Sequence, residues 1–189
     1  MSVRDHPDIK QNYGDNKMKK NISNTAKAAV IGAMYAVLTY LSAGMGLAFG
    51  GVQFRFSEAL TVLPLFSPTA CVGLAVGCAV SNIISSVSPL DIIFGSIATL
   101  LAAVLTRLLR NVTVKRFPLP SFLSPVIVNG LVVGAEISLL GGTEEVSLAL
   151  FAVNALSVAA GEAAVMFTLG VALWSLVRKN GTLRRTLEK

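Results

Sequence analysis

Residues 90–110 of the chain read LDIIFGSIATLLAAVLTRLLR. Between Asp91 and Arg107 this stretch has no charged residue, and its length matches the roughly 20 largely apolar residues with which a helix crosses a bilayer. It ends in arginines, which are typical of the cytoplasmic end of a membrane span. The stretch therefore predicts a transmembrane helix.

The composition of the whole chain agrees with this interpretation. Of the 189 residues, 53% are hydrophobic and 14% are charged, and the mean hydropathy is +0.69. Soluble domains carry roughly a quarter charged residues. Between Ala28 and Arg107 the only charged residues are Arg55, Glu58 and Asp91. A soluble enzyme, a nucleic-acid-binding domain and a disordered protein are poor fits, and we predict an all-α polytopic membrane protein.

Six segments are expected to form transmembrane helices, namely residues 26–43, 54–66, 70–86, 92–109, 122–140 and 147–177. The second is short for a crossing, and we expect the long sixth to protrude at its cytoplasmic end. The domain prediction is a disordered cytoplasmic tail over residues 1–25, a six-helix transmembrane domain over 26–177 and a basic cytoplasmic tail over 178–189.

The distribution of lysine and arginine predicts the orientation, because cytoplasmic connections are enriched in these residues. Six lie at or before Lys27, four lie in residues 107–116 and five lie from Arg178 onward, which leaves only Arg55. Both termini are therefore predicted to be cytoplasmic. The outer connections are then residues 44–53, 85–90 and 141–146.

Ionisable groups at membrane depth are costly and by default indicate a functional site. The charged candidates are Arg55, Glu58, Asp91, Glu136 and Glu162, and the amide candidates are Gln53, Asn82, Asn129 and Asn154. Asn129 and Glu136 are seven residues apart and share a helix face. We expect several helices to bring these groups to one polar pocket that opens outward.

Several of these residues have a purely structural alternative. Arg55 and Glu58 are three apart and could pair on a helix surface. Asp91 could cap the fourth helix, and Glu136 could reach the lipid headgroups. Glu162 has no cation nearby in the sequence and lies far from either end of its helix, which favours contact with a ligand or a proton.

The first predicted helix carries small residues at every fourth position, in the sets Ala28, Gly32, Ala36 and Ala29, Ala33. This spacing lets another helix approach closely in lipid. The face is either an internal packing seam or a docking face for a separate membrane subunit.

Two cysteines, Cys71 and Cys78, lie in one apolar stretch, and the one histidine, His6, is in the polar tail. We interpret the cysteines as small buried side chains rather than as a disulfide or a zinc site. We expect no metal and no cofactor.

Several stretches resemble the QueT family. These are VQFRFSEALTVLPLF (52–66), GLAVGCAVSNIISS (73–86) and LDIIFGSIATLLAAVLTRLLR (90–110), joined more weakly by VNGLVVGAEISLL (128–140) and NALSVAAGEAAVMFTLG (154–170). The family consists of substrate-binding S components of energy-coupling factor (ECF) transporters that take up queuosine precursors. The resemblance covers about residues 26–177.

The resemblance implies a six-helix S component in the plasma membrane of a bacterial cell. Such a subunit captures its substrate outside and associates with a transmembrane coupling subunit and two ATPases, which carry out the ATP hydrolysis. The small-residue faces of the first helix match the position of the docking motif of this class, and the outer loops after the first and third helices would gate the substrate.

The polar candidates fit such a substrate chemically. A 7-deazaguanine ring presents a ring N–H and an exocyclic amine side by side, and one carboxylate accepts from both. We assign Glu162 to this edge and Glu136 or Asp91 to the ring substituent, with Asn82, Asn129 or Asn154 donating to the carbonyl. Phe49, Phe54, Phe56 and Phe94 offer rings for stacking.

Other classes of function remain as alternatives. An intramembrane enzyme is disfavoured because no predicted span contains histidine and because Asp91 is the only candidate for the two intramembrane aspartates of an aspartyl protease. There is also no Walker A pattern. A stand-alone proton-coupled carrier would use Glu136 and Glu162 as a relay. An S component for another small molecule, such as a vitamin, is the third alternative.

Overall fold

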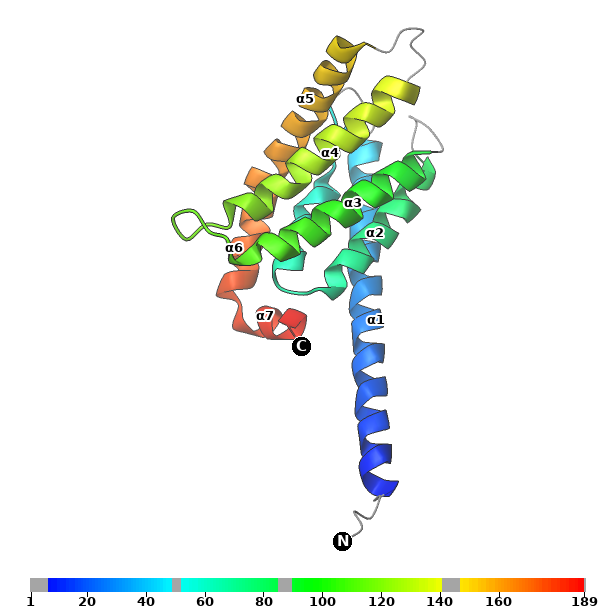
Figure 1. Cartoon of the computed structure of the whole chain (residues 1–189), viewed down its shortest axis with the longest axis vertical. Coiled ribbons are helices and arrows are strands. Elements are labelled where there is room, and N and C mark those ends of the chain that lie inside the picture. The colour runs from blue at the N-terminus through cyan, green and yellow to red at the C-terminus, as the bar shows by residue number, and fades with distance from the viewer. Residues whose placement is uncertain (1–6, 49–51, 85–89, 141–146, 189) are drawn as a thin grey trace.

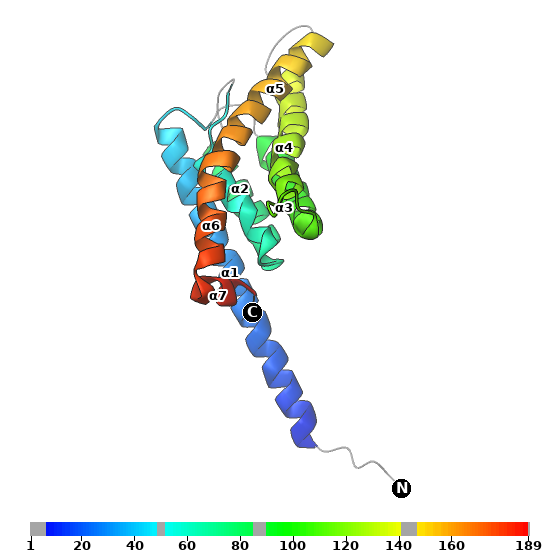
Figure 2. The same cartoon turned by 90° about the vertical axis from the view of Figure 1, so that its left-hand side faces the viewer.

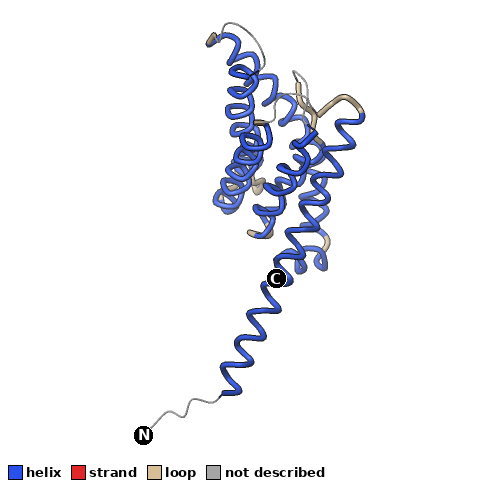
Figure 3. The backbone as a smooth tube through the Cα atoms, turned by 90° about the vertical axis from the view of Figure 1, so that its right-hand side faces the viewer, coloured by secondary structure: helices blue, strands red, loops and turns tan. Residues whose placement is uncertain are grey.

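The computed structural model describes residues 7–48, 52–84, 90–140 and 147–188, and within them the chain is helical without a strand (Figure 3). The longer elements are α1 Pro7–Gly44, α2 Thr69–Ser81, α3 Asp91–Leu108, α4 Leu119–Leu140, α5 Leu148–Val165, α6 Val171–Lys179 and α7 Gly181–Glu188. The short elements are η1 Phe56–Leu65, η2 Asn82–Ile84, η3 Leu109–Asn111 and η4 Met166–Gly170. The predicted all-α class is confirmed.

Helices that follow one another in the chain pack side by side, α1 on α2, α2 on α3, α3 on α4 and α4 on α5. Figure 1 shows α3 and α4 together at the front of the bundle, and Figure 2 shows α1 and α6 on the opposite side. The core consists of apolar clusters between these layers, including Tyr35, Leu74, Phe122 and Met166. Cys78 is free and buried in this core, and so is Cys71.

Four helical stretches in the described part of the chain are long and apolar enough to cross a membrane. They are Lys17–Gly44, Asp91–Asn111, Leu119–Leu140 and Leu148–Lys179. The last joins α5, η4 and α6 into one run of 32 residues, which agrees with the long sixth segment predicted. The second and third predicted segments are helical but shorter, so the number of crossings stays a prediction.

The second segment, η1, is a 3-10 helix of ten residues at the centre of the bundle. A 3-10 helix rises about 2 Å per residue, so η1 extends about 20 Å, more than an α-helix of the same length. Its residues from Ser57 to Pro64 are all buried, and it contacts α1, α3, α5, α6 and η4. A helix that is enclosed on all sides places any polar side chain in the protein interior, and Glu58 is such a side chain.

The seam between α1 and α2 depends on three glycines. A Cβ atom added to Gly73 would lie 2.6 Å from the carbonyl oxygen of Ala28, and one added to Gly77 would lie 2.6 Å from that of Gly32. The two backbones therefore approach more closely than any side chain would permit, in the manner of small-residue seams in lipid.

The N-terminal segment differs from the sequence-based expectation. Residues predicted as a disordered tail are helical from Pro7 onward and project away from the bundle (Figure 1). After Pro7, which suits the first position of a helix, this tail contains no further proline and only one glycine, Gly14, so little in it breaks a helix.

The C-terminal tail also forms a helix. Asn180 accepts hydrogen bonds from the backbone N–H groups of Thr182 and Leu183 at 3.1 Å each, and so caps the start of α7. Leu183 and Leu187 pack on the apolar core, while the arginines between them stay exposed. The basic tail is therefore an amphipathic helix that covers one end of the bundle (Figure 1).

Candidate functional site

A polar cavity lies inside the bundle where η1 meets α3, α4 and α5. Its lining consists of Gln53, Arg55, Glu58, Gly95, Thr99, Asn129, Val133, Val158 and Glu162. The space left for the centres of water-sized molecules is about 10 Å³, which is close to what one water molecule needs. We call this feature the acidic cavity; it is nearly closed in this structure.

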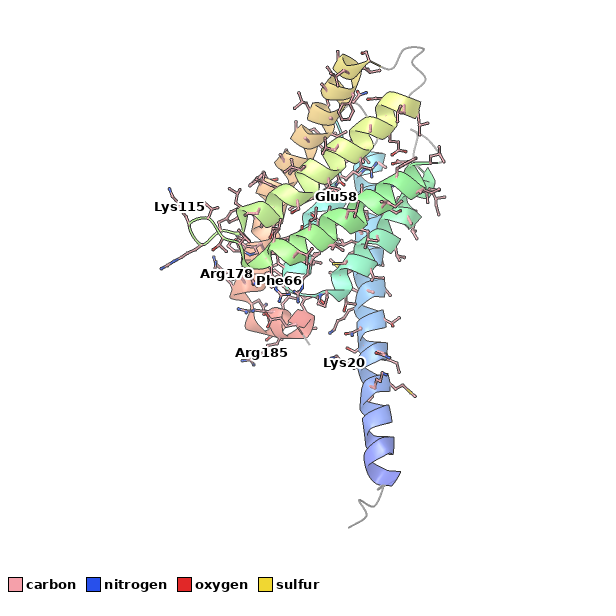
Figure 4. The ribbon with its side chains drawn as sticks, viewed as in Figure 1. Lys20, Glu58, Phe66, Lys115, Arg178 and Arg185 are labelled. Atoms are coloured by element: carbon pink, nitrogen blue, oxygen red, sulfur yellow. The ribbon has the colours of Figure 1, made fainter. Side chains whose placement is uncertain are left out.

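Glu58 lines the acidic cavity and lies within the bundle (Figure 4). The hydroxyl group of Tyr35 on α1 donates a hydrogen bond to one carboxyl oxygen of Glu58. The amide nitrogen of Asn129 on α4 lies 3.5 Å from the other oxygen. Glu58 is therefore held from two helices at once.

Glu162 on α5 lines the same cavity and is 5% exposed. It is close enough to interact with the Glu58 carboxyl and the Asn129 amide. Among the described residues, its oxygen Oε1 has no hydrogen-bond partner. Because Oε1 has no partner among them, it is available to accept a hydrogen bond from a ligand. The preceding residue, Gly161, allows α5 to lie against the backbone of Gln53, where a Cβ atom would collide with the Gln53 carbonyl group.

Arg55 links the acidic cavity to a second carboxyl group. Its Nε donates to the carbonyl oxygen of Ala48 at 3.1 Å, its Nη1 to the Oδ1 of Asn82 at 3.3 Å, and its Nη2 lies 3.5 Å from the Oδ2 of Asp91. The amide nitrogen of Asn82 in turn donates to the backbone carbonyl of Asp91 at 2.9 Å. Glu136 lies next to Asp91 and is 3% exposed.

These contacts decide between the alternatives that the sequence left open. Arg55 and Glu58 are both buried rather than paired on a helix surface, and the ion pair of Arg55 in the described structure is with Asp91. The N-cap of α3 is Leu90, so Asp91 is not the cap. Glu136 is buried beside Asp91 and does not reach toward headgroups.

The polar groups of this region are unbalanced in charge. Four carboxyl groups, those of Glu58, Asp91, Glu136 and Glu162, surround the one guanidinium of Arg55 within the described part of the interior. Carboxylates close together in a medium of low dielectric constant repel one another when both are ionised. A ligand that brings hydrogen-bond donors or a positive charge would therefore be stabilised here.

The structure brings together seven of the ten residues predicted for the site. Arg55, Glu58, Asn129 and Glu162 line the acidic cavity, whereas Asn82, Asp91 and Glu136 adjoin it through Arg55.

Asn154, Phe94 and Phe54 lie elsewhere, which corrects their expected placement. Asn154 donates to the hydroxyl of Ser138 at 2.9 Å in the seam between α4 and α5. Phe94 is 41% exposed on the outer face of the bundle, and Phe54 does not line the cavity. An aromatic ring at the outer end of a span is as well placed to face lipid as to face a pocket. Phe49 lies outside the described residues.

Sequence reasoning missed several residues of the site. Tyr35, Gly95, Thr99, Val133 and Val158 either hold Glu58 or line the cavity. The signal that could have revealed Tyr35 is its hydroxyl group within an apolar span, because a buried tyrosine normally finds a polar partner. A Cβ atom on Gly95 would collide with the amide of Asn82, so this glycine makes room for the polar network.

The two small-residue sets of α1 have different environments. Gly32 and Ala36 are buried against α2, so the set with Ala28 belongs mainly to the internal seam. Ala29 and Ala33 are exposed and border an apolar groove of about 420 Å³, whose opposite wall is formed by Val72, Val76 and Val80 of α2. The set with Ala28 lines the floor of the same groove.

The fold and the cavity together define the class to which the chain belongs. It is a multi-pass helical protein of the cell membrane with an acidic site enclosed between its helices. The QueT transporter family matches residues 25–179, and the chain belongs to this family. The resemblance seen in the sequence is thereby confirmed.

One curated relative is the queuosine precursor transporter QueT of Lactococcus lactis subsp. cremoris (strain MG1363). It is 32% identical to this chain over 72 residues, which cover 38% of this chain and 42% of the relative. No solved structure matches the chain.

Proposed function

We propose that the chain is the substrate-binding membrane subunit of an ECF-type importer for queuosine precursors. The observation that carries the proposal is the acidic cavity, in which the carboxyl groups of Glu58 and Glu162 meet the amide of Asn129 at the centre of the bundle. The family membership supports a transport role, and the name of the relative supports the substrate class.

The cavity complements a 7-deazaguanine ring. The carboxylate of Glu162 can accept from the ring N–H and the exocyclic amine, one of them at Oε1, which has no partner among the described residues, and two such bonds to one carboxylate are strong because they are charge-assisted. Asn129 faces the same space and can donate to the ring carbonyl. The surplus of carboxyl groups around Asp91 and Glu136 suits a cationic substituent such as an aminomethyl group.

The small volume of the acidic cavity means that the helices around it must separate before a bicyclic ring can enter. Arg55 and Asn82 connect the start of η1 to the start of α3, so these contacts would have to change when the helices separate. In this proposal the present structure corresponds to the closed form, and capture from outside precedes coupling to ATP hydrolysis in partner subunits.

Calorimetric titration of the purified chain tests the proposal. The ligands are the 7-cyano and 7-aminomethyl deazaguanine precursors and the free base queuine, with guanine and two vitamins as controls. We expect submicromolar binding of one deazaguanine, the aminomethyl compound first, and binding of guanine at least tenfold weaker.

Other outcomes of the titration would point elsewhere. Binding of a vitamin alone would keep the S-component role and overturn the substrate. Uptake by liposomes that contain only this chain and a proton gradient would indicate the carrier alternative.

The proposed coupling subunit needs a docking face, and the groove beside Ala29 and Ala33 is suited to it because small residues allow a close helix contact. Replacing both alanines by leucine should reduce assembly with the coupling subunit at least tenfold in co-purification, while substrate binding stays unchanged. The control replaces Ala152 and Ala160, which are exposed on α5, by leucine. Equal loss in the control would overturn this docking face.

A further inference from the structure

A second cavity lies at the end of the bundle that carries the C-terminus, and it shares no residue with the acidic cavity. Its volume is about 570 Å³, and it is bordered by the connections η1–α2 and α3–α4 and by α6 and α7. Its lining contains one carboxylate, Glu188, and the arginines Arg107, Arg110, Arg116, Arg178 and Arg184. We call it the arginine cavity; two of its lining residues, Arg178 and Phe66, are labelled at this end of the bundle in Figure 4.

Three of these arginines are held in place by neighbouring groups. The Nη1 of Arg107 donates to the carbonyl oxygens of Pro64 and Leu65 at 3.1 Å each. The guanidinium of Arg178 stacks 5.1 Å from the centre of the Trp174 ring. Arg184 pairs with Glu188 at 2.7 Å. Each contact uses only part of a guanidinium, which has five N–H donors.

The backbone that carries Arg116 is in an unfavourable conformation. Val114 and Phe117 form a β-bridge around Lys115 and Arg116, whose φ angles are 49° and 67°. Such two-residue turns normally use Asn-Gly, because residues with a Cβ atom rarely adopt positive φ. The turn places Arg116 at the cavity wall and directs Lys115 away from it (Figure 4). Strained turns of this kind are found at ligand clamps.

Five guanidinium groups around one hollow repel one another, and an anion with several oxygens would offset that repulsion. Phosphate fits best, because the arginine fork matches pairs of phosphate oxygens. The cavity lies at the end predicted to be cytoplasmic, where the membrane surface carries anionic lipids. The same α3–α4 connection borders an apolar groove of about 300 Å³, with Leu109 and Leu119 among its lining residues.

From these features we propose that the arginine cavity binds the phosphate of an anionic phospholipid, with an acyl chain beside α3 and α4. The site would anchor the η1–α2 turn, the α3–α4 connection and α7 to one headgroup. It is independent of the substrate assigned to the acidic cavity.

The only tryptophan of the chain, Trp174, lines the arginine cavity and reports on it. The experiment measures quenching of its fluorescence by brominated phosphatidylglycerol and by brominated phosphatidylcholine, in nanodiscs that hold the full chain. We expect brominated phosphatidylglycerol to reach half-maximal quenching at a mole fraction about tenfold lower than that required of brominated phosphatidylcholine. An arginine near the surface contributes about fivefold to the binding of such a lipid, so the double variant R110Q/R116Q should lose the preference. The single variant R116Q should reduce it about fivefold.

The matched control is the double variant K115Q/R185Q, which removes two cations from the same end of the chain but from outside the cavity lining. It should keep the preference, and circular dichroism should show all variants folded. Equal quenching by both lipids in the wild-type chain, or equal loss in the control, would overturn the site and leave the arginines as topological charge or as a surface for a partner protein. Displacement of the lipid quenching by pyrophosphate at matched ionic strength is expected of a phosphate site. If pyrophosphate changes the Trp174 fluorescence while the two lipids quench equally, the ligand is a soluble phosphate and the lipid assignment is wrong.

Discussion

Replacement of Glu162 by glutamine should weaken binding of the preferred deazaguanine about a hundredfold, which corresponds to about 2.7 kcal/mol. Glutamine has nearly the same shape but replaces one acceptor oxygen by an NH₂ group, which would face the donors of the ligand. The buried oxygen Oε1 of Glu162 lacks a partner in the described structure, so the substitution removes no described hydrogen bond from that atom. Calorimetric titration of the variant measures the effect.

The matched control for this experiment is Asn154→Ala. Asn154 was also predicted to contact the substrate, but its amide bonds to Ser138 away from the acidic cavity. The affinity of this variant should stay within about twofold of the wild-type value. Unchanged affinity in Glu162→Gln, or an equal loss in both variants, would show that Glu162 does not carry ligand recognition.

Glu58 is a less informative target although it lies in the same cavity. It accepts a hydrogen bond from Tyr35 and faces the amide of Asn129, so a change there disturbs contacts that hold α1, η1 and α4 together. A loss of affinity in a Glu58 variant would combine altered packing with altered recognition. Glu162 separates the two effects better.

The sequence predicts the chemical composition of the site better than its geometry. Charged and amide groups in apolar segments are visible directly, and Glu58, Asn129 and Glu162 do meet in one cavity. The physical reason for this gathering is that polar side chains in a membrane interior are costly unless they pair with one another. Such groups occur in several of the predicted segments, and the fold brings most of them to one region of the interior.

Which side chains pair with one another could not be predicted in the same way. Arg55 is three residues from Glu58 but pairs with Asp91, because η1 is a 3-10 helix enclosed by the bundle and its side chains meet different neighbours. That conformation depends on the surrounding helices rather than on local propensity. The two small-residue sets of α1 could not be told apart from the sequence for the same reason. The glycines of α2 determine which set is buried in the seam with α2, and they lie far away in the sequence.

The second large effect is expected at Arg55. Replacing it by methionine should destabilise the chain by about 3–5 kcal/mol, because Asp91 and its neighbour Glu136 would stay buried without a cation. The double variant R55M/D91N should recover part of this loss, since it removes the uncompensated charge as well. Unfolding of the detergent-solubilised variants R55M, D91N and R55M/D91N measures the three losses, and the loss in the double variant minus the sum of the two single losses gives the coupling energy of the pair.

Arg184→Met provides the contrast that identifies burial as the cause. The ion pair of Arg184 with Glu188 is shorter, 2.7 Å against 3.5 Å for Arg55 with Asp91, but its arginine side chain is 52% exposed. Water screens an exposed pair, so its loss should cost no more than about 0.5 kcal/mol. If loss of the exposed pair proved as costly as loss of the buried one, distance rather than desolvation would govern the contribution of ion pairs to stability here.

If Arg55→Met unfolded no more readily than the wild-type chain, the network from Arg55 to Asp91 would not hold the closed form of the acidic cavity together.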